Sequence, residues 1–382
     1  MPIQLVKNIH ELEKYESDWD RLATNPAMAF DWMKSWWQAF GANHELHVLV
    51  VSNDRGTVIG IAPWYISKQL GTRTLKFLGS GKVCSDYLQI LTQPNDQIVV
   101  ESELFDHIEK ATRRVAAVSI FRGIELEGIQ ADKSQMVGLL SRFTEKGYQV
   151  QDKPLENAWQ IALPDTWENL LATLYSSFRR KIKKCVERID SGVLQVRSAE
   201  TESDWQQAYT VLSELHQARR KSIHSDGCFD DARFCKFLHG AIPAMMKKRQ
   251  ARVVWLTADN KPIAACLLLL GKSYIGMYQS GIDPNSMSFE PGHTLAGFLV
   301  RDAIQNKIAT YDFMRGNEPY KTLWRAKPIG LTKCFLVPPT FGARSAHGLE
   351  SFARRAVQRI RKAAQSTQLQ PPEIEQNAQA AT

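Results

Sequence analysis

The sequence predicts a mixed α/β (α+β) protein of two tandem units, each with a mainly antiparallel central sheet flanked by helices. Two observations predict this class. Corresponding segments occur in the same order in both halves, and each half contains short apolar runs separated by tight turns, as in an antiparallel meander. With 382 residues and 43.3 kDa, the chain is long enough for two domains.

The repeat begins with helices. Residues 17–19 (SDW) correspond to residues 203–205 (SDW), and residues 30–41 (FDWMKSWWQAFG) correspond to residues 229–240 (FDDARFCKFLHG). The second pair predicts two aromatic helices that start at Phe-Asp and stop at glycine. We interpret the order of these matches as a duplication.

The repeat continues through a hairpin, since HVLVVSND matches RVVWLTAD and VIGIAPWYI matches PIAACLLLL. In the first half we expect a crossover helix, a further helix and five strands. The helices are at 104–115 and 135–146, and the strands at 47–52, 58–67, 74–79, 119–126 and 159–163. The last of these strands is expected to complete the first unit.

The second half repeats the meander and ends in a crossover. We expect strands at 251–257, 263–270 and 273–280, a helix at 294–306 after a Pro-Gly turn, and a strand at 308–313. A long basic helix, residues 167–191, is expected to connect the halves, with a Pro-Asp-Thr cap and a stop at Gly192.

These elements divide the chain into four segments. Residues 1–165 form the first unit and residues 166–340 the second, with 166–192 as the connecting helix. Residues 341–365 form a basic helix, and the Gln-, Ala- and Pro-rich residues 366–382 are expected to be disordered.

Composition favours a globular protein of the cytoplasm. The chain is 44% hydrophobic and 23% charged, and we find neither a signal peptide nor a long apolar span. Six scattered cysteines without a CxxC pair indicate neither disulfides nor a metal site. The net charge of +8 is concentrated in residues 179–184 and 354–362, which are candidates for contact with anionic partners or a membrane surface, or are simply solvated helix faces.

Several segments in this order resemble the Fem/CelD-like branch of the Gcn5-related N-acetyltransferase (GNAT) superfamily. They include FDWMKSWWQAFG, FLGSGKVCSDYLQIL, SFRRKIKKCVERIDSG, SFEPGHTLAGFLVRDAI and YDFMRGNEPYKTLW. The resemblance implies two tandem GNAT-like units and transfer of an acyl group. It also implies acetyl-coenzyme A or another acyl-coenzyme A as the donor, without a metal, and a sugar or envelope precursor as the acceptor.

The turn that corresponds to the pyrophosphate loop of GNAT enzymes is Glu290-Pro291-Gly292-His293-Thr294. It keeps one glycine of the family's Arg/Gln-x-x-Gly-x-Gly/Ala signature. The free amides at the start of the following helix are still suited to a phosphate. We therefore predict that Gly292, His293 and Thr294 bind the donor.

A dense polar segment follows the last predicted core strand. Tyr320 could donate a proton to the leaving group, and Lys321 could bind phosphate or carboxylate. Asp312 is a candidate base or an ion-pair partner of Arg315, which is itself a candidate anion ligand. For each of these residues, packing or solvent exposure is the competing interpretation.

Four further residues are candidates with weaker support. His216, on a predicted helix, could act as a base, and His224 in the next loop could contact the acceptor. Asp86 and Tyr87 could bind substrate in a cleft between the units. A structural histidine and a cap at a strand start are the alternatives.

Two other functions remain open from the sequence. A Fem-like ligase would take its acyl group from aminoacyl-tRNA and would need the basic helices to bind RNA. A non-catalytic scaffold in polysaccharide synthesis would need no reactive residue at all. Apart from the tRNA of the first alternative, we expect no nucleic-acid partner.

Overall fold

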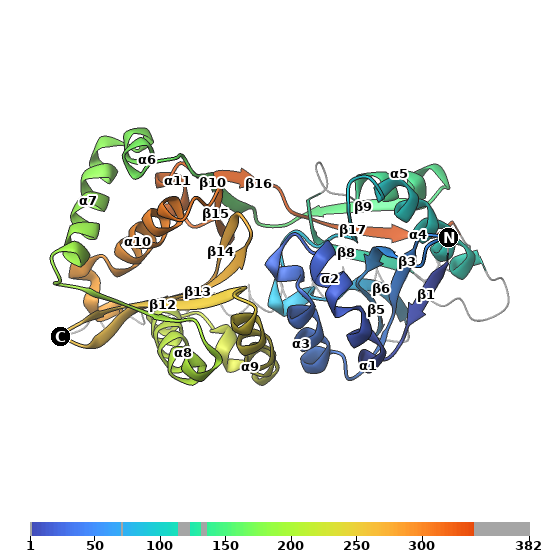
Figure 1. Ribbon diagram of the computed structural model, residues 1–382, viewed down its shortest axis with the longest axis horizontal. Coiled ribbons are helices and arrows are strands. Elements are labelled where there is room, and N and C mark those ends of the chain that lie inside the picture. Colours follow the sequence, from blue (N-terminus) through green and yellow to red (C-terminus); the bar gives the residue numbers. More distant parts are fainter. Residues whose placement is uncertain (1, 70–71, 114–122, 131–135, 340–382) are drawn as a thin grey trace, which may run out of the picture.

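The computed structural model of the chain describes residues 2–69, 72–113, 123–130 and 136–339. In this part an N-terminal and a C-terminal unit lie side by side (Figure 1). The predicted class, α/β with mixed sheets flanked by helices, is confirmed. The predicted helix 341–365 and the tail 366–382 lie outside the described residues.

The C-terminal unit is built on seven described strands in the order β11-β12-β13-β14-β15-β10-β16. Neighbouring strands are antiparallel except β14 and β15, which are parallel. The predicted meander and final strand are confirmed, with ends shifted by a few residues. The strands are β10 Ala158–Ala162, β11 Gln195–Ala199, β12 Ala251–Ala258, β13 Lys261–Gly271, β14 Tyr274–Ile282, β15 Thr310–Arg315 and β16 Lys327–Ile329.

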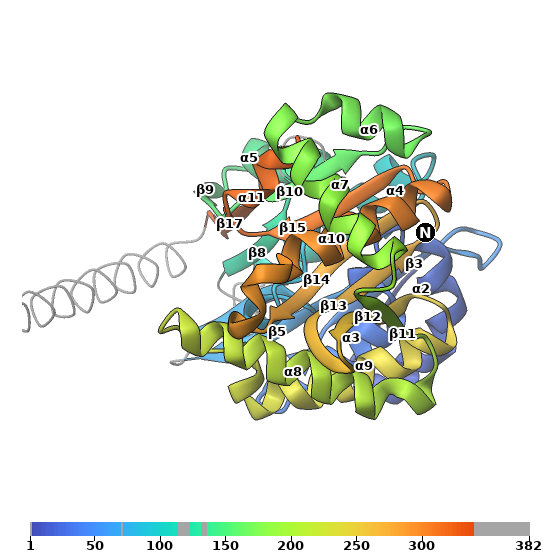
Figure 2. The ribbon, with the colours of Figure 1, turned by 90° about the vertical axis from the view of Figure 1, so that its left-hand side faces the viewer.

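Helices cover both faces of this sheet (Figure 2). Along β12, Val253 and Trp255 belong to one core, while Val254 and Leu256 belong to the other, because successive side chains of a strand point to opposite faces. One face carries α8 Trp205–Ser222 and α9 Ala232–Lys247; the other carries α6 Trp167–Thr173, α7 Ser176–Asp190 and α10 Pro291–Gln305.

The prediction of one helix over residues 167–191 is wrong, because the chain breaks between α6 and α7. Leu174 and Tyr175 are extended, with ψ of 151° and 141°. Arg325 stabilises the break: its Nε donates to Thr173 O at 3.0 Å, and its guanidinium lies 3.7 Å from the Tyr175 ring. The predicted cap is confirmed, since Thr166 Oγ1 accepts from Asn169 N at 3.2 Å.

The predicted stop of the second aromatic helix at Gly240 is also wrong. In the first half, α3 Phe30–Phe40 does end at Gly41, but α9 continues to Lys247. Gly240 instead lies against α3, where an added Cβ would lie 3.0 Å from Ser35 Oγ. This glycine serves the close approach of two helices.

The N-terminal unit contains a four-stranded sheet, β1-β3-β4-β7, and a six-stranded sheet, β2-β5-β6-β8-β17-β9, within the described residues. The run predicted as one strand over 58–67 is divided at Pro63 into β4 and β5. A proline cannot donate to a strand ladder, so it suits the point where the chain changes sheet. The strands are β1 Ile3–Val6, β2 His44–Leu46, β3 Val48–Ser52, β4 Val58–Ala62, β5 Trp64–Gln69, β6 Thr72–Phe77, β7 Leu91–Thr92, β8 Gly123–Ile129, β9 Gln149–Pro154 and β17 Thr332–Val337.

As in the C-terminal unit, one pair of strands here is parallel and is joined by a crossover helix. This pair is β6 and β8, and the helix is α4 Gln97–Arg113. A second helix, α5 Val137–Glu145, packs against α4. Within the described residues both predicted helices, 104–115 and 135–146, are confirmed, although α4 begins at Gln97.

The two units exchange strands. The strand predicted over 159–163 to complete the first unit is β10, and it pairs with β15 and β16 of the second; this part of the prediction is wrong. Conversely, β17 pairs with β8 and β9 of the N-terminal sheet. The apolar pattern of a short strand does not specify its neighbour in space.

The corresponding helices α3 and α9 pack against each other across the unit boundary. Trp32 is completely buried there, with its ring 4.7 Å from Phe237 and 4.9 Å from Tyr278. Trp36 of the same helix is buried as well, whereas Trp37 is half-buried. One hydrophobic core therefore extends through both units.

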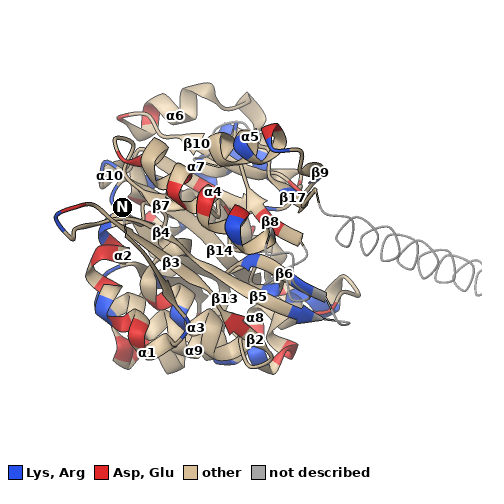
Figure 3. Ribbon diagram, turned by 90° about the vertical axis from the view of Figure 1, so that its right-hand side faces the viewer, with Lys and Arg blue, Asp and Glu red and all other residues tan. Residues whose placement is uncertain are grey.

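At the surface the same contact ends in an ion-pair cluster. Lys248, which follows α9, lies 2.6 Å from Glu16, 2.8 Å from Asp20 and 2.8 Å from Asp31. Figure 3 shows acidic residues on α1 Ile9–Leu12 and α2 Glu16–Leu22, on this side of the N-terminal unit.

Because the core is continuous, we expect both units to unfold together. Trp32→Ala should lower the free energy of unfolding by about 3–5 kcal/mol and keep a single transition. Urea unfolding followed by near- and far-ultraviolet circular dichroism measures this. Trp37→Ala, at a half-buried site on the same helix, is the control and should lower the free energy of unfolding by less. Two separate unfolding transitions would contradict a shared core.

Candidate active site

A pocket opens where β14 and β15 separate. The strands pair only from Tyr274–Thr310 to Gly276–Asp312, and β14 then continues alone on that side. Tyr278 forms a bulge there, since Leu268 pairs with Met277 and Leu267 with Gln279. The pocket has a volume of about 600 Å³, the size of a site for a cofactor or small substrate.

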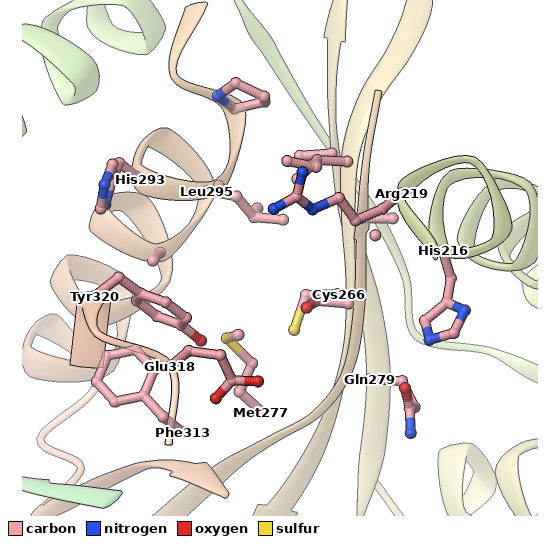
Figure 4. A pocket seen from close by; sticks show the side chains of 18 of the residues that line it. His216, Arg219, Cys266, Met277, Gln279, His293, Leu295, Phe313, Glu318 and Tyr320 are labelled. Atoms are coloured by element: carbon pink, nitrogen blue, oxygen red, sulfur yellow. The ribbon is translucent and has the colours of Figure 1, made fainter. Parts of the chain in front are cut away.

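The pocket is lined from five sides. The contributing elements are α8, β13, β14, the first turn of α10 with the 3-10 turn Pro284–Phe289 before it, and the loop from β15 to α11 Tyr320–Leu323. Figure 4 shows Tyr320, Glu318 and Met277 facing one region of the pocket, with Arg219 reaching toward it from α8.

The first turn of α10 forms one wall. Glu290 has a left-handed backbone (φ 52°) and precedes Pro291 at the first helical position. Lys181 Nζ lies 2.9 Å from Glu290 Oε1, so α7 holds this turn in place. Gly292 and His293 line the pocket, and burial lowers the pKa of His293. Donor binding by these two residues stays a prediction.

Thr294 does not fit its predicted role. It is completely buried, its amide donates to Glu290 O at 2.9 Å, and its hydroxyl donates to Phe289 O at 2.9 Å. Both groups that could bind a phosphate are therefore engaged within the turn. The donor-binding prediction depends on Gly292 and His293.

Tyr320 is half-buried at the opposite wall. Its ring lies 5.7 Å from Phe313 and 6.4 Å from His293, and in Figure 4 its hydroxyl points toward Glu318. Burial raises the pKa of Tyr320, which keeps the phenol protonated at neutral pH. A protonated phenol at this place can donate a proton to a leaving group.

Lys321 holds the loop together. Its side chain is 2% exposed, and Nζ donates to Met314 O at 3.0 Å, Arg315 O at 3.2 Å and Gly316 O at 3.0 Å. Glu318 Oε2 lies 2.9 Å away. An ammonium has three protons to donate, and the three carbonyls use all of them. This conflicts with the prediction that Lys321 binds phosphate or carboxylate on a substrate.

The carboxylate of Asp312 is likewise engaged in hydrogen bonds within the protein. Its Oδ2 accepts from Tyr87 Oη at 2.7 Å, Tyr274 Oη at 2.9 Å and Gln160 Nε2 at 2.9 Å, and its Oδ1 accepts from Met314 N at 2.6 Å. Burial raises its pKa, and it lies outside the pocket lining. It is placed as a structural centre rather than as the predicted base.

Arg315 pairs with Asp86, not with Asp312. Its Nε lies 2.8 Å and its terminal nitrogen 2.7 Å from Asp86 Oδ1. Burial raises the pKa of Asp86 to about 6, against the lowering effect of Arg315. Asp86 and Tyr87 do lie between the units as predicted, but they bind protein side chains there and do not line the pocket.

Two of the three predicted histidines, His216 and His224, lie apart from Tyr320. His216 is buried, with Nδ1 3.2 Å from Gln217 Oε1, and burial lowers its pKa. Although it lines the pocket, Figure 4 places it across the strands from Tyr320 and Glu318. His224 is exposed and is not among the lining residues.

The charged pocket residues without a predicted role include Glu318, Arg219 and Arg220. Both arginines are exposed, and neither forms an ion pair within the described part of the chain. The adjacent Arg219-Arg220 after His216 was the available signal, and Glu318 belongs to the same polar segment as Tyr320. The pocket therefore combines two unpaired cations with a helix start, which suits an anionic ligand.

A protein-family model matches the part of the chain that contains the pocket. A model described as an acetyltransferase (GNAT) domain matches residues 176–322, which include α7 to α10 and Tyr320. The chain is thus an acyltransferase. This similarity covers less than half of the chain.

Solved structures share the fold over both units. FemX has a TM-score of 0.61 at 12% identity, covering 87% of this chain and 97% of its own. The C-terminal domain of a putative lysylphosphatidylglycerol synthetase from Agrobacterium fabrum has a TM-score of 0.54 at 11% identity, covering 90% and 95%. L-PGS from Bacillus licheniformis has a TM-score of 0.51 at 8% identity, and the match covers 92% of this chain and 97% of that one.

The Fem/GNAT side of the predicted resemblance is supported by these matches, whereas the CelD-like assignment stays a prediction. No curated protein sequence matches the chain. Among the described residues, no helix has the length and apolar content to cross a membrane. In the same part of the chain, His, Cys, Asp and Glu side chains do not gather in a group that could hold a metal ion.

A substitution distinguishes a structural from a catalytic Lys321. Lys321→Met should lower the free energy of unfolding by about 3 kcal/mol, because it leaves buried carbonyls without a donor. Lys327→Met, at an exposed site in β16, should change it by less than about 0.5 kcal/mol. Chemical unfolding of the two variants measures the difference; equal stabilities would contradict the structural role.

Proposed function

We propose that the chain transfers an acyl group from an acyl-coenzyme A, most simply acetyl-coenzyme A, to an amine or hydroxyl group. The acceptor we propose is a sugar or cell-envelope precursor in the cytoplasm. The acceptor class rests on the Fem/CelD-like resemblance of the sequence, and the donor rests on the pocket.

One observation carries the donor proposal. The opening between β14 and β15 leads to the first turn of α10, where Gly292 and His293 present backbone amides. Arg219 and Arg220 add two positive charges at the same pocket. A donor pyrophosphate bound by these amides and cations would direct the acyl chain along β14 toward Tyr320.

The reaction needs one acid and one base. The acceptor nitrogen or oxygen attacks the thioester carbonyl carbon, the carbon–sulfur bond breaks, and Tyr320 donates its proton to the departing sulfur. Glu318 takes the proton that the acceptor loses and returns it to Tyr320. The contact between Glu318 and Lys321 holds the carboxylate beside the pocket.

An aminoacyl-tRNA donor is the second candidate. It is favoured by the similarity to FemX, and the exposed Arg180, Lys183 and Lys184 of α7 would face the RNA. Binding of RNA through phosphates would weaken steeply with added salt. A tRNA titration at two salt concentrations therefore separates this candidate from the coenzyme A proposal.

The first test concerns the helix start. Gly292→Asp should weaken acetyl-coenzyme A binding at least tenfold in calorimetric titration, because a carboxylate would face the phosphate. The helix itself should not suffer, since a negative charge suits its first turn and an added Cβ would meet only Ile282 Cγ2, at 3.8 Å.

The matched control is Gly292→Asn, which adds the same volume without charge and should bind within about threefold of the unsubstituted protein. Equal affinities for the two variants would contradict a phosphate at this turn. If the unsubstituted protein itself gives no heat at millimolar acetyl-coenzyme A, the donor proposal is wrong.

The second test concerns Tyr320. Tyr320→Phe should lower kcat at least 100-fold and leave the dissociation constant of the donor within about twofold, because the hydroxyl acts only as carbon–sulfur cleavage begins. Tyr175→Phe, at an exposed site outside the pocket lining, is the control and should retain full activity. Retained activity in Tyr320→Phe would exclude this residue as the acid.

A further inference from the structure

A short segment of the N-terminal unit, residues 83–87, contacts both strands that enclose the pocket. Tyr278 Oη, from the bulge of β14, donates to Val83 O at 2.7 Å. Tyr87 Oη donates to Asp312 Oδ2, on β15, at 2.7 Å. The segment thus lies at the point where β14 and β15 separate.

The charged contact of this segment is the ion pair between Asp86 and Arg315. Asp86 is 1% exposed, and its carboxylate accepts from both Arg315 Nε at 2.8 Å and Arg315 N at 3.1 Å. Gly128 of β8 leaves room for the guanidinium: an added Cβ would lie 3.2 Å from the Arg315 terminal nitrogen and 2.7 Å from Ser85 O. The N-terminal unit therefore contains a fitted site for Arg315.

Arg315 itself lines the pocket, and its contacts continue along the loop. Arg315 O accepts from Lys321 Nζ at 3.2 Å, and the same ammonium pairs with Glu318 at 2.9 Å. Glu318 and Tyr320 face the pocket in Figure 4. Asp86 is thus connected to the reacting side of the loop through two charged residues, although it is absent from the pocket lining.

The segment is itself held firmly by the N-terminal unit. Cys84 and Tyr87 have left-handed backbones (φ 51° and 63°), which non-glycine residues adopt only when their surroundings impose it. Trp32 Nε1 donates to Ser85 Oγ at 2.8 Å, and Asn25 Nδ2 donates to Asp86 O at 3.0 Å. The buried helix α3 is therefore one of its supports.

We propose that Asp86 is a positioning residue and that residues 83–87 are a brace through which the N-terminal unit orders the catalytic loop of the C-terminal unit. In this role the N-terminal unit carries no reaction of its own. The effect on turnover rests on the proposed function, whereas the effect on the loop does not.

The test compares two contacts between the units. Asp86→Asn removes the charge that holds Arg315. Lys248→Met removes the ion pairs to Glu16, Asp20 and Asp31 at the other contact. We expect Asp86→Asn to lower kcat at least tenfold with the dissociation constant of acetyl-coenzyme A changed less than twofold, and Lys248→Met to leave kcat unchanged. Equal effects of the two variants on kcat would overturn the proposal.

Hydrogen exchange supplies a readout that needs no substrate. Amides of residues 314–323 should exchange at least tenfold faster in Asp86→Asn than in Lys248→Met. Amides of the core strands β12 and β13 should exchange at the same rate in both variants. Unchanged exchange in residues 314–323 would overturn the brace even if the protein proved inactive toward acetyl-coenzyme A. If only turnover is absent in the unsubstituted protein, the proposed function fails and the brace stands.

Asp86→Asn could prevent folding because it leaves Arg315 buried without a counter-charge. Tyr87→Phe is the milder variant, since it removes one of four hydrogen bonds to Asp312 and keeps the ring. We expect the same direction of change in kcat and in exchange of residues 314–323, by about threefold. No change in either quantity would overturn the proposal.

Discussion

The site depends on which groups form hydrogen bonds with the main chain where β14 and β15 separate. A parallel pair normally bonds along its whole length, but here it ends after three residues of each strand. Main-chain groups beyond that point need other partners, because buried unpaired carbonyls and amides are costly. Asp312 accepts the amide of Met314, and Lys321 donates to three successive carbonyls from Met314 onward. Two ionisable residues thus bind the main chain beyond the end of the strand pairing.

This use of Asp312 and Lys321 decides which side chains remain for chemistry. Tyr320, Glu318 and the first turn of α10 face the pocket, and Arg219 and Arg220 add charge at its edge. The left-handed backbone of Met314 and the glycine at position 316 (φ 127°) turn the loop so that Glu318 meets Lys321. Strain in the loop is therefore offset by the same lysine that orients the carboxylate.

The duplicated halves diverge immediately after their parallel strand pairs. In the C-terminal unit β14 continues through Met277 to Ile282 and forms a pocket wall. In the N-terminal unit the corresponding strand β6 ends at Phe77, and left-handed glycines at 79 and 81 turn the chain toward its neighbour. One copy of the fold thus forms the pocket, and the other supplies residues 83–87 against it. The exchanged strands β10 and β17 and the α3–α9 contact fix the two copies in register.

The sequence by itself determined the central strands of both halves, most of the longer helices and the region of the candidate site. Local patterns carry this information: strand runs such as 263–270, the Thr166 cap, and the Pro-Gly turn before a helix are specified by neighbouring residues. The tertiary structure alone decided the partners. It placed β10 in the sheet of the C-terminal unit and continued α9 beyond Gly240 to Lys247. It divided the helix predicted over 167–191 at Leu174. It also paired Arg315 with Asp86, 229 residues away, and engaged Lys321 with carbonyls. The physical reason is that a charged side chain's role depends on which groups surround it after folding, and those groups come from distant segments.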